Sequence, residues 1–145
     1  MSRSVNIKTS LFSFYLLMGF VLFSQKEANI WYFGINAGVD FNSGQPVALT
    51  NGALSTFEGC ASICDVSGNL LFYTGGTEVY NRNHQVMPNG TGLLGNPSST
   101  QSVIIVPKPL SVDSYYLFTV AAFENPTDGL NYSIVDMSQD NGLGD

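Results

Sequence analysis

Two cysteines are the first residues of this sequence that could carry chemistry, as a disulfide or as metal ligands. Cys60 and Cys64 lie in one predicted strand, residues 60–65, where a rise of about 3.3 Å per residue places their Cα atoms roughly 13 Å apart. A disulfide needs Cα atoms within about 7 Å, so the two cysteines cannot pair in that strand. No histidine or further cysteine stands at ligand spacing, so neither a metal site nor another cofactor is predicted. We expect two small thiols packed between layers of sheet, on the strand face that also carries Ser62.

His84 is the only histidine, and therefore the only side chain whose ordinary pKa would suit a general base near neutral pH. The sequence has no Gly-x-Ser-x-Gly elbow to expose a nucleophile beside it. We interpret His84 as a strand-end side chain that is hydrogen-bonded to a turn.

Paired carboxylates are the other route to chemistry, because glycosidases use two of them about 5 to 10 Å apart. Six acidic residues at the ends of predicted strands are candidates: Asp40, Glu58, Asp65, Glu78, Asp128 and Asp136. Solubility explains acids in such places, so we predict no catalytic residue and favour a binding protein over an enzyme.

The loop at residues 88–101 has the glycine content of a phosphate-binding loop. It lacks the Gly-Lys-Ser/Thr ending, and no helix follows it to direct backbone amides at an anion. We interpret it as a linker between two sheets. Its last four residues are polar, precede a strand and could line the end of a sheet, where β-propellers bind ligands. They are the predicted binding residues: Ser98, Ser99, Thr100 and Gln101.

The first residues predict export. Residues 1–8 carry Arg3 and Lys8 without an acid, and residues 11–23 are almost entirely apolar. A membrane span needs roughly 20 apolar residues, so this shorter run favours a signal peptide over residues 1–24. The predicted location is secreted or at the cell surface, with no membrane span after cleavage.

The remaining chain, residues 25–145, is acidic. Only Lys26, Arg82 and Lys108 stand against eleven acids, which gives a net charge of 3 − 11 = −8. Such a surface repels nucleic acid and anionic membranes, so the predicted partner is an extracellular glycan or protein.

These residues form a single domain of the all-β class. The length suits one modest domain, and no window shows apolar residues at helical spacing between capping residues. Aromatic and β-branched runs between turn residues predict strands instead. The predicted strands are residues 30–33, 38–41, 47–49, 60–65, 70–74, 78–81, 102–106, 115–120 and 131–137, and residues 88–90 are predicted to form a turn. The aromatic residues expected in the core are Trp31, Tyr32, Phe33, Phe72, Tyr73 and Phe118.

A weak internal repeat suggests how these strands are grouped. Ala61 matches Val103, 42 positions later, and Leu71 matches Tyr116, 45 positions later. Periods of about 40 to 50 residues are typical of β-propeller blades. We therefore predict a partial β-propeller of two to three sheets, with a β-sandwich as the alternative.

Several separated motifs resemble the amino-terminal, propeller-like region of large secreted Bacteroidetes proteins that end in a gliding-motility-associated sorting domain for type IX secretion. The motifs occupy residues 29–34, 37–41, 58–63, 68–74, 83–90 and 99–107. The resemblance implies export and a propeller-like fold, and it brings no catalytic signature. Cys64 stands where the family pattern suggests Ser, and Gly75 stands where it suggests Asp, which removes an acid from a possible cation site.

The function predicted from these observations is a non-catalytic extracellular binding or surface-display module, connected with adhesion or gliding. A polysaccharide-acting enzyme and a purely structural spacer stay open as alternatives. A propeller needs at least four blades of about 40 residues, so we also expect the domain at 25–145 to be truncated and to continue beyond Asp145.

Overall fold

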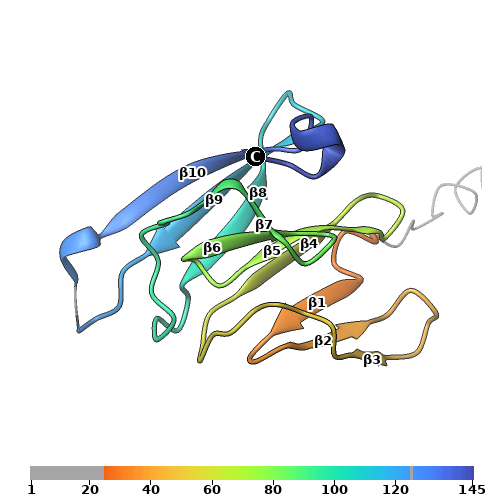
Figure 1. Ribbon diagram of the computed structural model, residues 1–145, viewed down its shortest axis with the longest axis horizontal. Coiled ribbons are helices and arrows are strands. Elements are labelled where there is room, and N and C mark those ends of the chain that lie inside the picture. The colour runs from red at the N-terminus through yellow and green to blue at the C-terminus, as the bar shows by residue number, and fades with distance from the viewer. Residues whose placement is uncertain (1–24, 125) are drawn as a thin grey trace, which may run out of the picture.

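The computed structural model describes residues 25–124 and 126–145, and this part of the chain is all-β (Figure 1). The first sheet contains β1 (Ile30–Phe33), β2 (Ala37–Asp40) and β3 (Val47–Leu49). The middle sheet contains β4 (Ala61–Cys64), β5 (Leu70–Thr74), β6 (Glu78–Asn81) and β7 (Val86–Thr91). The third sheet contains β8 (Val103–Pro107), β9 (Ser114–Val120) and β10 (Leu130–Asp136). Two short 3₁₀ turns, Pro126–Asp128 and Asp140–Gly142, complete the described elements. The predicted signal peptide, residues 1–24, lies outside them.

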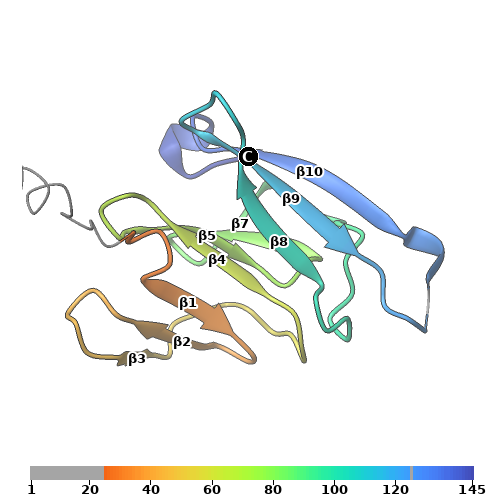
Figure 2. The same cartoon turned by 180° about the vertical axis from the view of Figure 1, so that it is seen from behind.

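Each sheet is antiparallel, with its strands side by side in chain order. Figures 1 and 2 show the three sheets stacked as layers, with the middle sheet between the other two. The first strands of the sheets meet, because β4 contacts both β1 and β8. This up-and-down order, with first strands adjacent from sheet to sheet, is compatible with a partial propeller-like arrangement and with a β-sandwich. The all-β fold class predicted from the sequence is confirmed.

The turn between β4 and β5 shows how local sequence fixes a hairpin. The Asp65 carboxylate accepts hydrogen bonds from the backbone N–H groups of Ser67 and Asn69, at 2.8 and 3.0 Å. Gly68 follows at φ +90°, where a side chain would be strained and would meet Asn42. Partial desolvation alone would raise the pKa of Asp65, but the hydrogen bonds from Asn69, Ser67 and Gly68 outweigh it and lower that pKa.

The larger core lies between the middle and third sheets. It is built from side chains that alternate along their strands: Ile63, Phe72, Val79, Met87, Val103, Leu117, Val135 and Met137. Phe72 and Leu117 are completely buried, and the Phe72 ring meets Tyr115 edge to face at 5.4 Å. Burial of the ring makes Phe72 a main contributor to stability.

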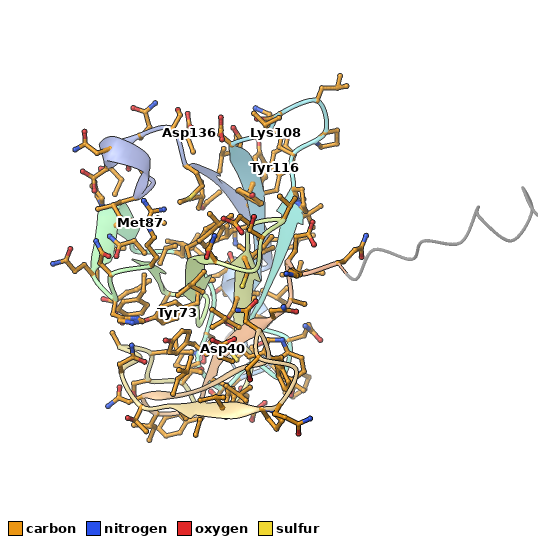
Figure 3. All side chains as sticks on the ribbon, turned by 90° about the vertical axis from the view of Figure 1, so that its right-hand side faces the viewer. Asp40, Tyr73, Met87, Lys108, Tyr116 and Asp136 are labelled. Atoms are coloured by element: carbon orange, nitrogen blue, oxygen red, sulfur yellow. The ribbon has the colours of Figure 1, made fainter. Side chains whose placement is uncertain are left out.

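A second core lies between the first and middle sheets and is a stack of tyrosines. The ring centroids of Tyr32 and Tyr73 are 4.5 Å apart, and those of Tyr73 and Tyr80 are 5.3 Å apart. Leu54 and Leu70 close the cluster. Figure 3 shows Tyr73 between these two layers. Offset stacking of this kind adds to the stabilisation from burial.

Two expectations about the elements were wrong. Residues 88–90 were predicted to form a turn, but they lie inside β7, whose one neighbour among the described strands is β6. An edge strand tolerates Pro88 because its missing N–H can face away from the ladder, and Asn89 takes a positive φ within the strand. Of the six aromatics expected in the core, Trp31 and Phe33 are 51 and 42 % exposed, and Phe118 is only half buried.

The described chain does form successive small antiparallel sheets, but the predicted match between Ala61 and Val103 was wrong. Ala61 faces the third sheet, whereas Val103 faces back toward the middle sheet. Equivalent residues of successive layers must face the same way, so Ala61 and Val103 are not structural equivalents. A shift of one residue exchanges the two faces of a strand, which is why the buried positions of β9 were misassigned.

Candidate binding groove

The four predicted binding residues gather along one polar groove of about 440 Å³. It is lined by Glu58, Ser98, Ser99, Thr100, Gln101, Ala121, Phe123 and Glu124. Three separate segments contribute: the one before β4, the one before β8 and the one after β9. The start of β8 and the end of β9 are adjacent because Val103 pairs with Thr119.

Hydrogen bonds hold the segment before β8 in place. The Asn96 side-chain oxygen accepts from both the backbone N–H and the hydroxyl of Ser98, each at 3.0 Å. The backbone N–H of Glu58 donates to the Pro97 carbonyl, and that of Gly59 donates to the Ser99 carbonyl, both at 3.1 Å. A Cβ at residue 59 would lie 2.3 Å from a backbone nitrogen, so this close approach requires glycine. The groove is therefore supported by a clamp of backbone contacts.

The side chains of the groove combine carboxylates, hydroxyls and one aromatic ring. Thr100 donates its hydroxyl to the Glu58 carboxylate at 2.8 Å, which orients both groups. Glu124 adds a second carboxylate, and none of the described lining residues is cationic. The Phe123 side chain is 95 % exposed. Such a surface can accept hydrogen bonds from a ligand's hydroxyl or N–H groups and offers a ring for it to lie against.

Ser98–Gln101 were predicted from the sequence as binding residues and Glu58 as a candidate acid, whereas Phe123 and Glu124 were not predicted. Both lie a few residues after the end of β9, and an aromatic residue beside an acid just after a strand was the signal available. The other candidate acids do not line the groove, and two of them accept hydrogen bonds from nearby backbone N–H groups. Asp40 accepts from the N–H of Asn42 at 2.7 Å, and Asp136 accepts from that of Ser138 at 2.9 Å.

His84 does not line the groove. It lies between β6 and β7 at φ +62°, and its ring bonds outside that turn. Its Nε2 is 2.8 Å from Asn51 Nδ2, and its Nδ1 is 3.0 Å from the Tyr73 hydroxyl. With the Asn51 amide donating to Nε2, the proton resides on Nδ1. Burial lowers the pKa of His84, and the two ring contacts make the side chain a structural link between layers.

Both cysteines are free thiols, and the faces assigned to them from sequence agree with the contacts. Ser62, between them, accepts a hydrogen bond from the Tyr32 N–H at 2.8 Å, and Cys64 Sγ lies 4.0 Å from the Ile30 carbonyl oxygen. This face of β4 therefore meets the first sheet. Burial raises the pKa of both thiols, which makes them poor nucleophiles.

Within the described ranges, no group of three or more His, Cys, Asp or Glu side chains is arranged to hold a metal ion. The same part of the chain contains no helix of the length and apolarity that a membrane crossing requires.

Comparison of the chain with protein-family models, with curated proteins and with solved structures found no match. The resemblance to secreted Bacteroidetes proteins therefore stays a prediction.

Proposed function

We propose that this chain is a non-catalytic extracellular binding or surface-display module whose ligand site is the groove at Ser98–Gln101. The proposal includes export by the leader at residues 1–24 and a role in adhesion. Its main support is that residues selected from sequence as binding candidates line one groove, together with Glu58 and the exposed ring of Phe123.

The chemistry of the groove favours a glycan over a protein as the ligand. Sugar hydroxyls donate to carboxylates and to the Gln101 carbonyl, and they exchange hydrogen bonds with Ser and Thr hydroxyls. The electron-rich face of the Phe123 ring attracts the polarised C–H groups of a sugar ring. A protein interface would instead be expected to have a larger apolar centre than one exposed ring provides.

The charge of the groove further selects among glycans. Glu58 and Glu124 both line it without a cationic neighbour among the lining residues, so uronic acids and sulfated sugars would be repelled. Neutral hexose or N-acetylhexosamine polymers fit the site. The preference for a neutral ligand is also consistent with the acidic surface of the whole domain.

A glycan array probed with the purified full chain tests the proposal. Wild-type protein should bind a set of neutral glycans, and Phe123→Ala and Thr100→Val should each lower that binding at least tenfold. Val112→Ala, in the exposed loop after β8, is the matched control and should leave binding unchanged. Absence of binding to every glycan would contradict the proposal and leave the structural-spacer alternative.

A polysaccharide-acting enzyme is the second candidate, because two carboxylates, Glu58 and Glu124, line the same groove. Hydrolysis would require one of them to protonate the leaving oxygen and the other to act on the anomeric carbon or on water. Release of reducing sugar from a bound glycan, abolished by Glu58→Gln or Glu124→Gln, would establish this activity. Binding without product release supports the first candidate.

A further inference from the structure

Two segments of the groove carry the same dipeptide, phenylalanine followed by glutamate. Phe57-Glu58 precedes β4, and Phe123-Glu124 follows β9. Both glutamates line the groove, and so does Phe123. The Phe57 side chain is 84 % exposed and that of Phe123 is 95 % exposed. Each groove carboxylate is therefore preceded in the chain by an aromatic ring that is open to solvent.

The two dipeptides belong to segments that contact residues 97–102 at different ends. The backbone N–H groups of Glu58 and Gly59 donate to the carbonyls of Pro97 and Ser99, at the start of this stretch. At its end, the N–H of residue 120, the last of β9, donates to the carbonyl of residue 102. The two Phe-Glu pairs therefore occupy separate positions beside the polar residues 98–101.

Each dipeptide is anchored by the buried residue that precedes it. Thr56 is buried, and its hydroxyl donates to the Pro97 carbonyl at 3.4 Å. Ala122 is also buried, and the N–H of Ala121 before it donates to the Gly129 carbonyl at 3.0 Å. The order of buried residue, exposed phenylalanine and groove glutamate is thus the same in both segments. A backbone fixed in this way can present each ring to a ligand with little ordering cost.

A Phe-Glu pair supplies two contacts that suit one sugar unit. The face of the ring packs against the C–H groups of the sugar, and the carboxylate accepts hydrogen bonds from its hydroxyl groups. Thr100 already orients the Glu58 carboxylate through a 2.8 Å hydrogen bond, and the carboxylate oxygens keep further acceptor positions. Two such pairs beside one groove provide two similar positions for sugar units.

We propose that the groove binds two units of one neutral glycan chain, one at Phe57-Glu58 and one at Phe123-Glu124. This two-position site rests on the proposed function and narrows its ligand to polymers, because a free sugar would occupy only one position. Units of one chain reinforce each other, since binding of the first raises the local concentration of the second. Affinity should therefore rise steeply with the length of the oligosaccharide.

NMR titration of the purified full chain tests this, with β-1,4-linked oligomers of glucose, mannose, galactose and N-acetylglucosamine as probes. In at least one series, wild-type protein should bind the hexasaccharide about tenfold or more tightly than the monosaccharide. Phe57→Ala and Phe123→Ala should each remove most of that difference. Each should change the monosaccharide affinity by no more than about twofold, because one position remains.

Two further variants control for the ring and for the surface. Phe57→Tyr keeps an aromatic ring and should retain the preference for the hexasaccharide. Val112→Ala changes an exposed apolar side chain in the loop after β8 and should also retain it. Circular dichroism should show all variants folded, because each of these side chains is largely exposed.

The outcomes distinguish the two-position site from the proposed function. Equal affinity for the monosaccharide and the hexasaccharide would overturn the two-position site and leave glycan binding established. So would a preference for the hexasaccharide that Phe57→Ala does not reduce. Absence of binding in all four series would overturn the two-position site as well, whereas the glycan array decides the proposed function by itself.

Discussion

The Tyr73 hydroxyl joins three segments, and its removal measures what that junction contributes to stability. It accepts from the backbone N–H of Ala53 at 2.9 Å and is 3.0 Å from His84 Nδ1. Tyr73→Phe keeps the fully buried ring and its stacking on Tyr32 and Tyr80, and removes only the two hydrogen bonds. Leaving partly buried donors unpaired should lower the free energy of unfolding by about 1 to 3 kcal/mol.

The matched control is Tyr115→Phe. The Tyr115 ring is packed edge to face on Phe72, and its hydroxyl makes no hydrogen bond among the described residues. The same chemical change there should alter stability by no more than about 0.5 kcal/mol. Urea denaturation at one fixed protein concentration measures both variants. If both variants lost the same unfolding free energy, the hydrogen bonds of the Tyr73 hydroxyl would contribute no more than the unbonded hydroxyl of Tyr115. That result would refute the assignment of a stabilising network to Tyr73.

A double-mutant cycle isolates the link between Tyr73 and His84. His84→Asn removes the ring and introduces a residue that tolerates the positive φ of this position. If the two side chains interact, the loss of unfolding free energy in the Tyr73→Phe/His84→Asn double variant should be smaller than the sum of the two single losses. The difference should be at least about 0.5 kcal/mol. Strict additivity would show that the two groups are not coupled.

Four further predictions concern the core, the titration of His84, the thiols and the leader. Phe72→Ala should lower the free energy of unfolding by about 3 to 5 kcal/mol, and a loss below about 1 kcal/mol would contradict its burial. The folded-state pKa of His84 is lowered. The stability that the neutral His84 ring contributes should therefore be complete above the ordinary histidine pKa of about 6.5, and it should be lost as the pH falls through the folded-state value. Denaturation of wild type and His84→Asn from pH 8 to pH 5 measures this, and a stability difference that does not change with pH would refute it. Native-state thiol labelling should modify Cys60 well before Cys64, which is 1 % exposed; equal rates would contradict that burial. Mass spectrometry of the exported protein should find a chain that begins near Gln25, and an intact Met1 would overturn the predicted export.

The positions of most strands could be predicted from local sequence, because a strand between turn residues leaves a local signal. Residues 70–74 are dense in apolar and aromatic side chains between turn residues, and β5 has these bounds. β7 shows the limit of the method. Pro88, Asn89 and Gly90 are turn formers by propensity, but β7 pairs with β6 on either side of them, at Val86 and Thr91, so they form an irregularity within a strand. Tertiary pairing of this kind has no local signature.

The candidate groove was predictable only in part, for the same reason. Ser98–Gln101 form a continuous polar segment, which a reader of the sequence can recognise. Phe123 and Glu124 reach the groove only because β9 pairs antiparallel with β8, which brings the end of one strand to the start of the other. Glu58 arrives from a third segment through the backbone clamp at Pro97 and Ser99. Sites assembled across sheets in this way require the pairing order before their members can be named.

The face of each strand was the least predictable feature. The third sheet is apolar on both sides: Leu117 faces the core, while Phe118 and Tyr116 face outward. A period of two divides such a strand into two faces but cannot say which is inside when both are apolar. In a sheet at the end of a stack, two apolar faces usually indicate that the strand belongs inside a larger structure. The misassigned Phe118 is thus explained by the second apolar face of this sheet, which also carries Tyr116 and Tyr132.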